Sequence, residues 1–144
     1  MTRITDPDAL FCYGTLCFAA IIRAVIGRVP QSIEATLPGF VCYQLHGASY
    51  PAIIPMPGDT AAGVLYKGIS DKELRSLDKY EGREYLRKQI EVCDASGQLH
   101  NAWGYVLAPG YYHRLKKQPW SRQAFAKHEM AQYITRHGWR TRGQ

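Results

Sequence analysis

Apolar and polar positions follow two different periods along the chain, which predicts strands and helices that alternate in sequence. Apolar or alternating runs typical of strands occupy residues 10–13, 35–45, 62–66, 85–92 and 102–107. The second run is interrupted by Pro38 and Gly39, and residues 50–56 contain two prolines. Because proline cannot donate to a central strand, we expect residues 50–56 to form an extended edge or a loop.

Three segments are predicted as helices, at residues 18–26, 70–81 and 121–137. The middle one begins with Ser70 as N-cap and has Glu73 three residues later, the spacing of a capping box. Each segment is followed by a glycine, a common signal for the end of a helix. At least five strands around few helices indicate a single α+β domain.

Length and composition agree with one soluble domain, and the charge is unevenly distributed. The chain has 144 residues, of which 46% are hydrophobic and 21% charged, with a net charge of +6. Residues 1–111 contain ten basic and eleven acidic residues, whereas residues 112–144 contain eight basic and one acidic residue. We therefore predict one domain over residues 1–144, with a basic helical C-terminal tail from about residue 112.

The four scattered cysteines and the absence of a long apolar segment favour the cytoplasm as the compartment of the protein. Cysteines without paired spacing, in a domain large enough for a full core, are typical of reduced thiols in a cytoplasmic protein. The apolar run at residues 10–22 follows Asp6 and Asp8, unlike a signal peptide, and is too short to span a membrane. We expect a cytoplasmic protein without a membrane partner.

Familiar catalytic and metal-binding motifs are missing. His128 and Glu129 start an HExxH pattern, but Gln132 stands where the second histidine belongs, so no zinc site is predicted. The other histidines lack ligand spacing and are interpreted as surface or satisfied core residues. Cys17 is an alternative nucleophile, since the dipole of a helix beginning there would lower its pKa. We predict neither a metal nor a cofactor.

A short segment, Tyr13-Gly14-Thr15-Leu16, joins the first predicted strand to the first helix. Glycine permits a tight turn, and the N–H groups at the start of a helix point outward, where they can hold a carboxylate or a phosphate. Many α/β proteins share such a turn, so by itself it favours a purely structural role over binding.

A second segment, residues 77–87, reads LDKYEGREYLR and places Glu81 at the end of a helix, directly before Gly82. A carboxylate at the negative end of a helix dipole, partly buried beside Tyr80 and Tyr85, should have a raised pKa. Such a group can act first as a general base and then as an acid near neutral pH. The alternative is a surface carboxylate paired with one of three nearby cations, Arg83, Arg87 or Lys88.

Together these two segments resemble the gamma-glutamylcyclotransferase-like family, in its AIG2-like branch. The resemblance continues in order through LPGF at residues 37–40, YPAI at 50–53 and GVLY at 63–66, and covers roughly residues 10–107. It implies a small mixed β-barrel with flanking helices and a pocket at one side.

The resemblance also implies an activity, the cyclisation of a γ-glutamyl group to 5-oxoproline with release of an amine or amino acid. It implies that Glu81 is the general acid/base and that Asp78 belongs to the same pattern. The substrate-binding residues that it implies are Tyr13, Gly14, Thr15, Leu16 and Tyr85. The chain has YGTL where glutathione-metabolising members tend to carry YGSN or YGSL, which favours the γ-glutamylamine side of the family.

Two other functions stay open at this point. A non-catalytic protein that binds a small amino-acid-like ligand can use the same fold, although it would not need the carboxylate of Glu81. Nucleic-acid binding would use the basic C-terminal segment, which contains no recognisable nucleic-acid motif, so a nucleic acid is not the expected partner. Its basic residues are Arg114, Lys116, Lys117, Arg122, Lys127, Arg136, Arg140 and Arg142.

Several aromatic residues outside the two motifs have two interpretations each. Trp103 and Tyr105 line either the pocket or the barrel core. Tyr111, Tyr112 and Trp120 either cover the pocket or pack against the last helix, and packing is favoured.

Overall fold

We describe a computed structural model of the chain, which covers residues 4–139. The strands are β1 (Ile4–Cys12), β2 (Ser32–Leu45), β3 (Pro51–Tyr66), β4 (Tyr85–Asp94), β5 (Leu99–Leu107) and β6 (Leu115–Pro119). The helices are α1 (Ala19–Ile26), α2 (Asp71–Glu81), α3 (Arg122–His128) and α4 (Met130–Arg136), with short 3-10 turns η1 (Thr15–Cys17), η2 (Gly82–Glu84) and η3 (Pro109–Arg114). None of the helices in this range has the length and apolar content that crossing a bilayer requires.

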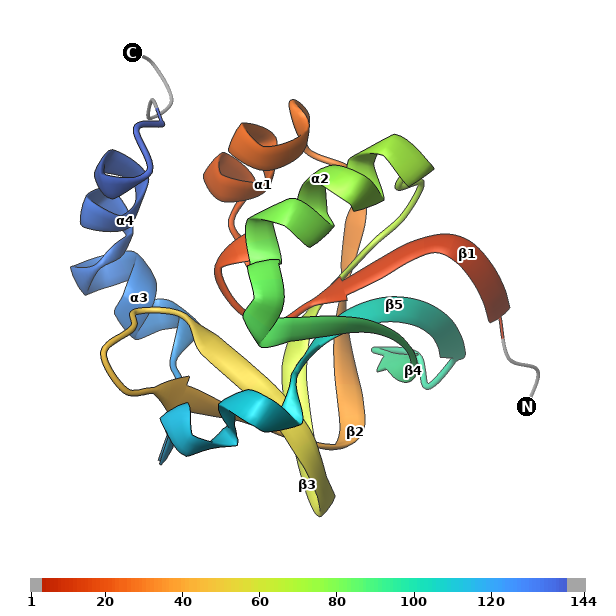
Figure 1. Cartoon of the computed structure of the whole chain (residues 1–144). Helices are drawn as coiled ribbons and strands as arrows, with labels where there is room; N and C mark the ends of the chain where they lie inside the picture. The colour runs from red at the N-terminus through yellow and green to blue at the C-terminus, as the bar shows by residue number, and fades with distance from the viewer. Residues whose placement is uncertain (1–3, 140–144) are drawn as a thin grey trace.

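Five of the strands form a closed barrel. Their order is β3-β1-β5-β4-β2, and further pairing of β2 with β3 closes the ring. The β1–β5 pair is parallel and the others are antiparallel, while β6 adds to β2 outside the ring. Helices α1 and α2 lie side by side against the barrel, and α3 and α4 occupy another side (Figure 1). The predicted α+β fold, a small mixed barrel with flanking helices, is confirmed.

Two apolar clusters fill this architecture. One fills the barrel interior and takes side chains from all five ring strands, among them Phe11, Leu37, Ile53, Val92 and Val106. The other lies between the outer face of the barrel and the helices and includes Leu10, Ile21, Leu77, Phe125 and Tyr133. Because side chains alternate along a strand, neighbouring residues of β1 belong to different clusters.

The segment at residues 50–56 is extended, as expected, but it is part of a longer strand than the sequence predicted. It runs into the predicted strand at 62–66, and together they form most of the 16-residue β3. β2 pairs with β3 along nearly its whole length, with a register shift between Pro38 and Phe40. The shift accommodates the proline and glycine in β2, so the long hairpin continues past them.

The prediction of a single final helix over residues 121–137 is wrong. The chain forms α3 and α4, separated at Glu129, whose φ of −131° and ψ of −19° are not helical. In a straight helix, residues 125 and 133 would be about 12 Å apart along the axis. The break instead brings the rings of Phe125 and Tyr133 into edge-to-face contact, with 5.4 Å between centroids.

The basic C-terminal segment, predicted as a helical tail from about residue 112, contains a strand before its helices. Its residues 115–119 form β6, which pairs with β2 and so joins the segment to the sheet. Arg114 forms an ion pair with Glu84, and Arg122 lies 3.6 Å from a carboxylate oxygen of Glu34. Arg140 and Arg142 lie outside the described residues.

Candidate active site

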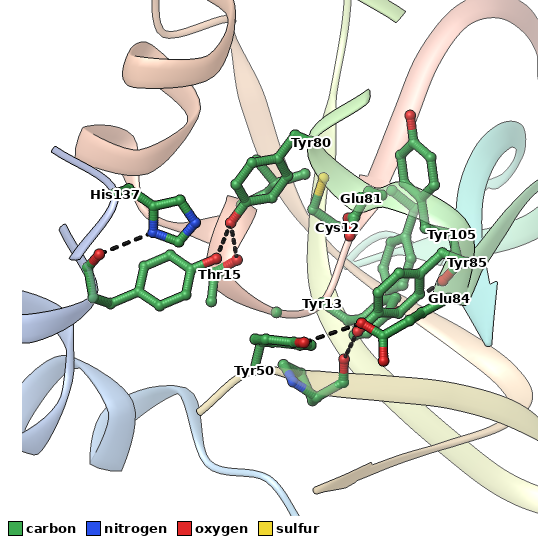
Figure 2. A pocket seen from close by; sticks show the side chains of 15 residues that line it. Cys12, Tyr13, Thr15, Tyr50, Tyr80, Glu81, Glu84, Tyr85, Tyr105 and His137 are labelled. Carbon is green, nitrogen blue, oxygen red and sulfur yellow. Dashed lines mark hydrogen bonds between the residues drawn. The ribbon is translucent and has the colours of Figure 1, made fainter. Parts of the chain in front are cut away.

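A cavity of about 190 Å³ lies between one end of the barrel and helices α2 and α4 (Figure 2). This volume is below the range of roughly 300–1,000 Å³ common for drug-sized ligands, and suits a ligand about the size of an amino acid. Its lining residues are Phe11, Cys12, Tyr13, Gly14, Thr15, Leu16, Tyr50, Pro51, Tyr80, Glu81, Glu84, Tyr85, Tyr105, Tyr133 and His137. All six residues predicted for the site therefore lie around one cavity.

The turn at Gly14 connects β1 to η1 and forms one wall of the cavity. The backbone at Gly14 has a negative φ of −115°. A side chain is excluded there by lack of space, because a Cβ would lie 2.9 Å from Cδ of Pro51. Thr15 and Leu16 are buried and are the first residues of η1, whose leading N–H groups have no partner within the turn.

Helix α2 carries Glu81 to the cavity, where its carboxyl lies near Cys12 and Tyr13 (Figure 2). Its start is set by the predicted capping box, in which the Glu73 N–H donates to Ser70 Oγ and the Ser70 N–H donates to Glu73 Oε1. Its end is set by Gly82, whose φ of 75° lies in the left-handed region that favours glycine. The last helical residue is thus Glu81, next to the cavity.

The carboxyl group of Glu81 has a raised pKa. Removal from water is the main cause, the nearby carboxylate of Asp78 adds to it, and the pKa rises to about 8. Arg87 does not neutralise Glu81, because its Nε donates to Asp78 Oδ1 at 2.7 Å. Within residues 4–139 the Glu81 side chain makes no hydrogen bond or ion pair, so the alternative of a paired surface carboxylate is wrong.

Tyrosines form much of the remaining wall, and three of them hold it together with hydrogen bonds, two buried and one partly buried. The Tyr13 hydroxyl donates to the carbonyl oxygen of Tyr105 at 2.7 Å, and the Tyr85 hydroxyl donates to that of Pro51 at 2.6 Å. The Tyr105 hydroxyl donates to Asp78 Oδ1 at 2.7 Å. Burial raises the pKa of Tyr13 and of Tyr85, so both phenols stay protonated.

Comparison with known proteins places the chain in a family. The family described as "Gamma-glutamyl cyclotransferase, AIG2-like" matches residues 10–125. The chain belongs to this AIG2-like gamma-glutamyl cyclotransferase family. AIG2-like protein D of Arabidopsis thaliana is 36% identical over 110 residues, which cover 75% of this chain and 72% of the relative. The resemblance noted from the sequence motifs is confirmed.

Solved structures agree on the fold. The solution structure of an Arabidopsis thaliana protein has a TM-score of 0.68 and 24% identity, and covers 90% of this chain and 87% of that one. A structure named gamma-glutamyl cyclotransferase has a TM-score of 0.65 and 18% identity, with 95% and 90% covered. At these identities the likeness concerns the barrel and its helices alone.

The AIG2-like cavity also contains residues that the motifs did not reveal. Glu84 accepts a hydrogen bond from the Tyr50 hydroxyl at 3.0 Å and pairs with Arg114. Tyr133 of α4 and His137, the residue directly after α4, line the cavity beyond the matched residues 10–125. His137 is exposed, as expected for a surface residue, and it also lies at the cavity. Its position eight residues after the break at Glu129 gave no signal in the sequence.

Tyr111 and Tyr112 belong to η3 and are not among the residues that line the cavity, so the interpretation that they cover the pocket is wrong. The Tyr111 ring stacks on that of His113, and Tyr112 is exposed.

Tyr105 lines the cavity, whereas Trp103 packs beneath the guanidinium of Arg87, 4.3 Å from the ring centroid. Trp120 packs near the last helices, with its indole N–H donating to the Ser49 carbonyl at 2.8 Å and its ring against Phe125.

Cys17 does not have the properties of an activated nucleophile. α1 begins at Ala19, beyond Cys17, and burial raises the pKa of the Cys17 thiol to about 11. The thiol donates to the Cys12 carbonyl at 3.2 Å. Within residues 4–139, no group of three or more histidine, cysteine or acidic side chains is arranged to hold a metal ion.

The raised pKa of Glu81 predicts a pH-dependent stability difference for Glu81→Gln. Between pH 4.5 and about 8 the unfolded chain loses the Glu81 proton while the folded protein keeps it, so folding stability falls as pH rises. Glutamine removes this effect. At pH 9 we expect Glu81→Gln to be more stable than the wild type by on the order of 2–4 kcal/mol, and at pH 4.5 nearly equal.

Urea unfolding at the two pH values measures this difference. The matched control is Glu129→Gln, which removes the same charge at an exposed position outside the cavity. An equal stability change for Glu81→Gln at both pH values would contradict the raised pKa.

Proposed function

We propose that this protein cyclises the γ-glutamyl group of a small amide or peptide to 5-oxoproline and releases an amine or amino acid. The observation that carries the proposal is Glu81, an unpaired carboxyl with a pKa of about 8, in the same cavity as the Gly14 turn. Membership in a gamma-glutamyl cyclotransferase family supports the same reaction.

In this proposal the Gly14 turn binds the α-carboxylate of the substrate. The leading N–H groups of η1 supply donors for an anion, and the burial of Thr15 and Leu16 keeps competing water away. The close packing of Gly14 on Pro51 fixes the position of the turn. A carboxylate held there leaves the α-amine and the γ-carbonyl extending across the cavity towards Glu81.

The reaction needs one group that takes a proton and returns it. Ionised Glu81 removes a proton from the α-ammonium, and the freed amine attacks the γ-carbonyl carbon to form the ring C–N bond. Protonated Glu81 then donates to the departing nitrogen as the original amide C–N bond breaks. The second proton of the ring nitrogen passes to the released amine, which leaves as an ammonium ion, so the lactam nitrogen keeps one hydrogen and Glu81 is ionised again. A pKa near 8 suits both steps, since the group exchanges protons readily in either direction near neutral pH.

The walls of the cavity favour the reactive shape of the substrate. Ring closure is intramolecular, so holding the folded-back conformer removes much of the entropic barrier. The tyrosine hydroxyls at positions 13 and 85 are already engaged with backbone carbonyls, so these residues form fixed walls. A small cavity with fixed walls disfavours extended conformers of the γ-glutamyl chain.

The proposal is tested with pairs of isomeric substrates. Each γ-glutamyl amine or γ-glutamyl amino acid is incubated beside its α-glutamyl isomer, and 5-oxoproline and the released amine are measured together. We expect equimolar release from at least one γ-linked compound and none above background from its α-linked isomer. Binding of γ-linked compounds without release would instead favour the non-catalytic small-ligand protein.

A further inference from the structure

Three hydroxyl groups from three separate elements meet at the wall of the cavity. Thr15 belongs to η1, Tyr80 to α2 and Tyr133 to α4. The Thr15 Oγ1 and Tyr80 OH are 2.8 Å apart, and the Tyr80 OH is also hydrogen-bonded to the Tyr133 OH. Figure 2 shows the Tyr80 hydroxyl pointing towards Thr15. We call these three residues the hydroxyl trio.

The hydroxyl trio can donate a hydrogen bond to an anion. Each hydroxyl carries one proton, and the two hydrogen bonds through Tyr80 engage two of the three. If the three hydroxyls form an open chain with two hydrogen bonds, one hydroxyl hydrogen is left to donate to a ligand in the cavity. Even a closed triangle can exchange one internal bond for a bond to a carboxylate, which is stronger because the acceptor is charged. Burial raises the pKa of Tyr80 and of Tyr133, so both remain donors.

The position of Tyr133 is set by packing that does not depend on its hydroxyl. Its ring contacts Phe125 edge-on, and Phe125 in turn stacks on Phe18 with 5.4 Å between centroids. The break at Glu129 allows α4 to reach the cavity from this anchor. The Tyr133 side chain is buried, as is Thr15. Removing the Tyr133 hydroxyl should therefore leave the fold intact.

We propose that Tyr133 is a positioning residue for the carboxylate of the substrate, acting through Tyr80 and Thr15. Thr15 belongs to the turn to which the proposed function assigns the α-carboxylate, so this inference rests on that function. α4 lies beyond the matched residues 10–125, which makes this contribution to the site a property of the C-terminal segment.

Two small molecules isolate the contribution of the carboxylate. 5-Oxoproline carries the carboxylate in question, and 2-pyrrolidinone is the same ring without it. We expect the wild type to bind 5-oxoproline about 10-fold more tightly than 2-pyrrolidinone by titration calorimetry. In Tyr133→Phe this ratio should fall several-fold through weaker binding of 5-oxoproline, with 2-pyrrolidinone unaffected. Tyr80→Phe, which removes the central hydroxyl, should show at least the same loss.

Kinetics with a γ-linked substrate gives a second readout. Tyr133→Phe should raise KM several-fold, by about the same factor as the lost binding of 5-oxoproline, with kcat within a factor of about three, because it weakens binding in the ground state and the transition state alike. Tyr112→Phe, at an exposed tyrosine outside the cavity, is the matched control and should change neither value. Thermal unfolding of each variant verifies that the protein is folded.

The outcomes separate this inference from the proposed function. A wild-type preference for 5-oxoproline that survives in Tyr133→Phe overturns the inference and leaves the proposed function standing. If the wild type binds 5-oxoproline no more tightly than 2-pyrrolidinone, the inference is also overturned, whatever the result with the γ-linked and α-linked isomers. Loss of the preference in Tyr133→Phe supports the inference even if none of the γ-linked compounds tested is turned over.

Discussion

Replacing Glu81 by glutamine is expected to lower kcat/KM for 5-oxoproline release by about 10²–10⁴-fold, the usual contribution of a general acid/base. Glutamine has nearly the same shape and makes the cavity no larger, but it neither takes the proton of the α-ammonium nor returns one to the leaving nitrogen. Substrate affinity should change little. The measurement is the initial rate of 5-oxoproline formation for purified wild type and variant.

Glu129→Gln serves as the control in this assay too, because its carboxylate is exposed and outside the cavity. It should retain the wild-type rate. The wild-type kcat/KM should also rise with pH up to about 8, since protonated Glu81 cannot accept another proton. A Glu81→Gln protein within about fivefold of wild type would show that another group transfers the proton.

Gly63→Ala is expected to destabilise the fold by about 3 kcal/mol or more. Gly63 lies in β3 where it passes the end of β1, and a Cβ there would be 2.1 Å from the carbonyl oxygen of Cys12 and 2.8 Å from Cζ of Phe11. Overpacking a core usually costs about 1–3 kcal/mol. Here the obstacle is a backbone atom of a barrel strand, so relief requires the strands to separate.

Thermal unfolding measures this cost, and we expect a decrease in Tm on the order of 10 °C. Gly110→Ala is the matched control, because its Cβ would enter open space. Gly104→Ala should have an intermediate effect, since its nearest obstacle is Cδ1 of Ile90, the end of a side chain that can turn away. Equal Tm values for the Gly63 and Gly110 variants would contradict the close approach of β1 and β3.

Local signals in the sequence account for most of the fold and for two walls of the site. The Ser70 capping box and Gly82 define both ends of α2, and with them the position of Glu81. The sequence predicts the turn at Gly14 correctly. The requirement for glycine there, however, comes from the close packing of Pro51, which is distant in sequence. Interactions within a few residues are visible in sequence, whereas contacts between distant segments are not.

The parts of the site that the sequence did not predict depend on such distant contacts. Tyr133 reaches the cavity only because the helix breaks at Glu129, and Glu129 is not a residue type that marks a helix end. Arg87 of β4 pairs with Asp78 of α2 rather than with Glu81, although the sequence offered Glu81 as a partner. Neither feature produces a change in hydrophobic period.

The attachment of β6 to β2 has a consequence for solubility. A closed ring has no free edge, but β6 stands at the end of the strand order and creates one. This edge is only five residues long, carries Lys116 and Lys117, and ends in Pro119. Short length, lysine and proline are the features by which natural sheets resist pairing with strands of other molecules. Part of the positive charge of the C-terminal segment thereby protects the protein from edge-to-edge aggregation.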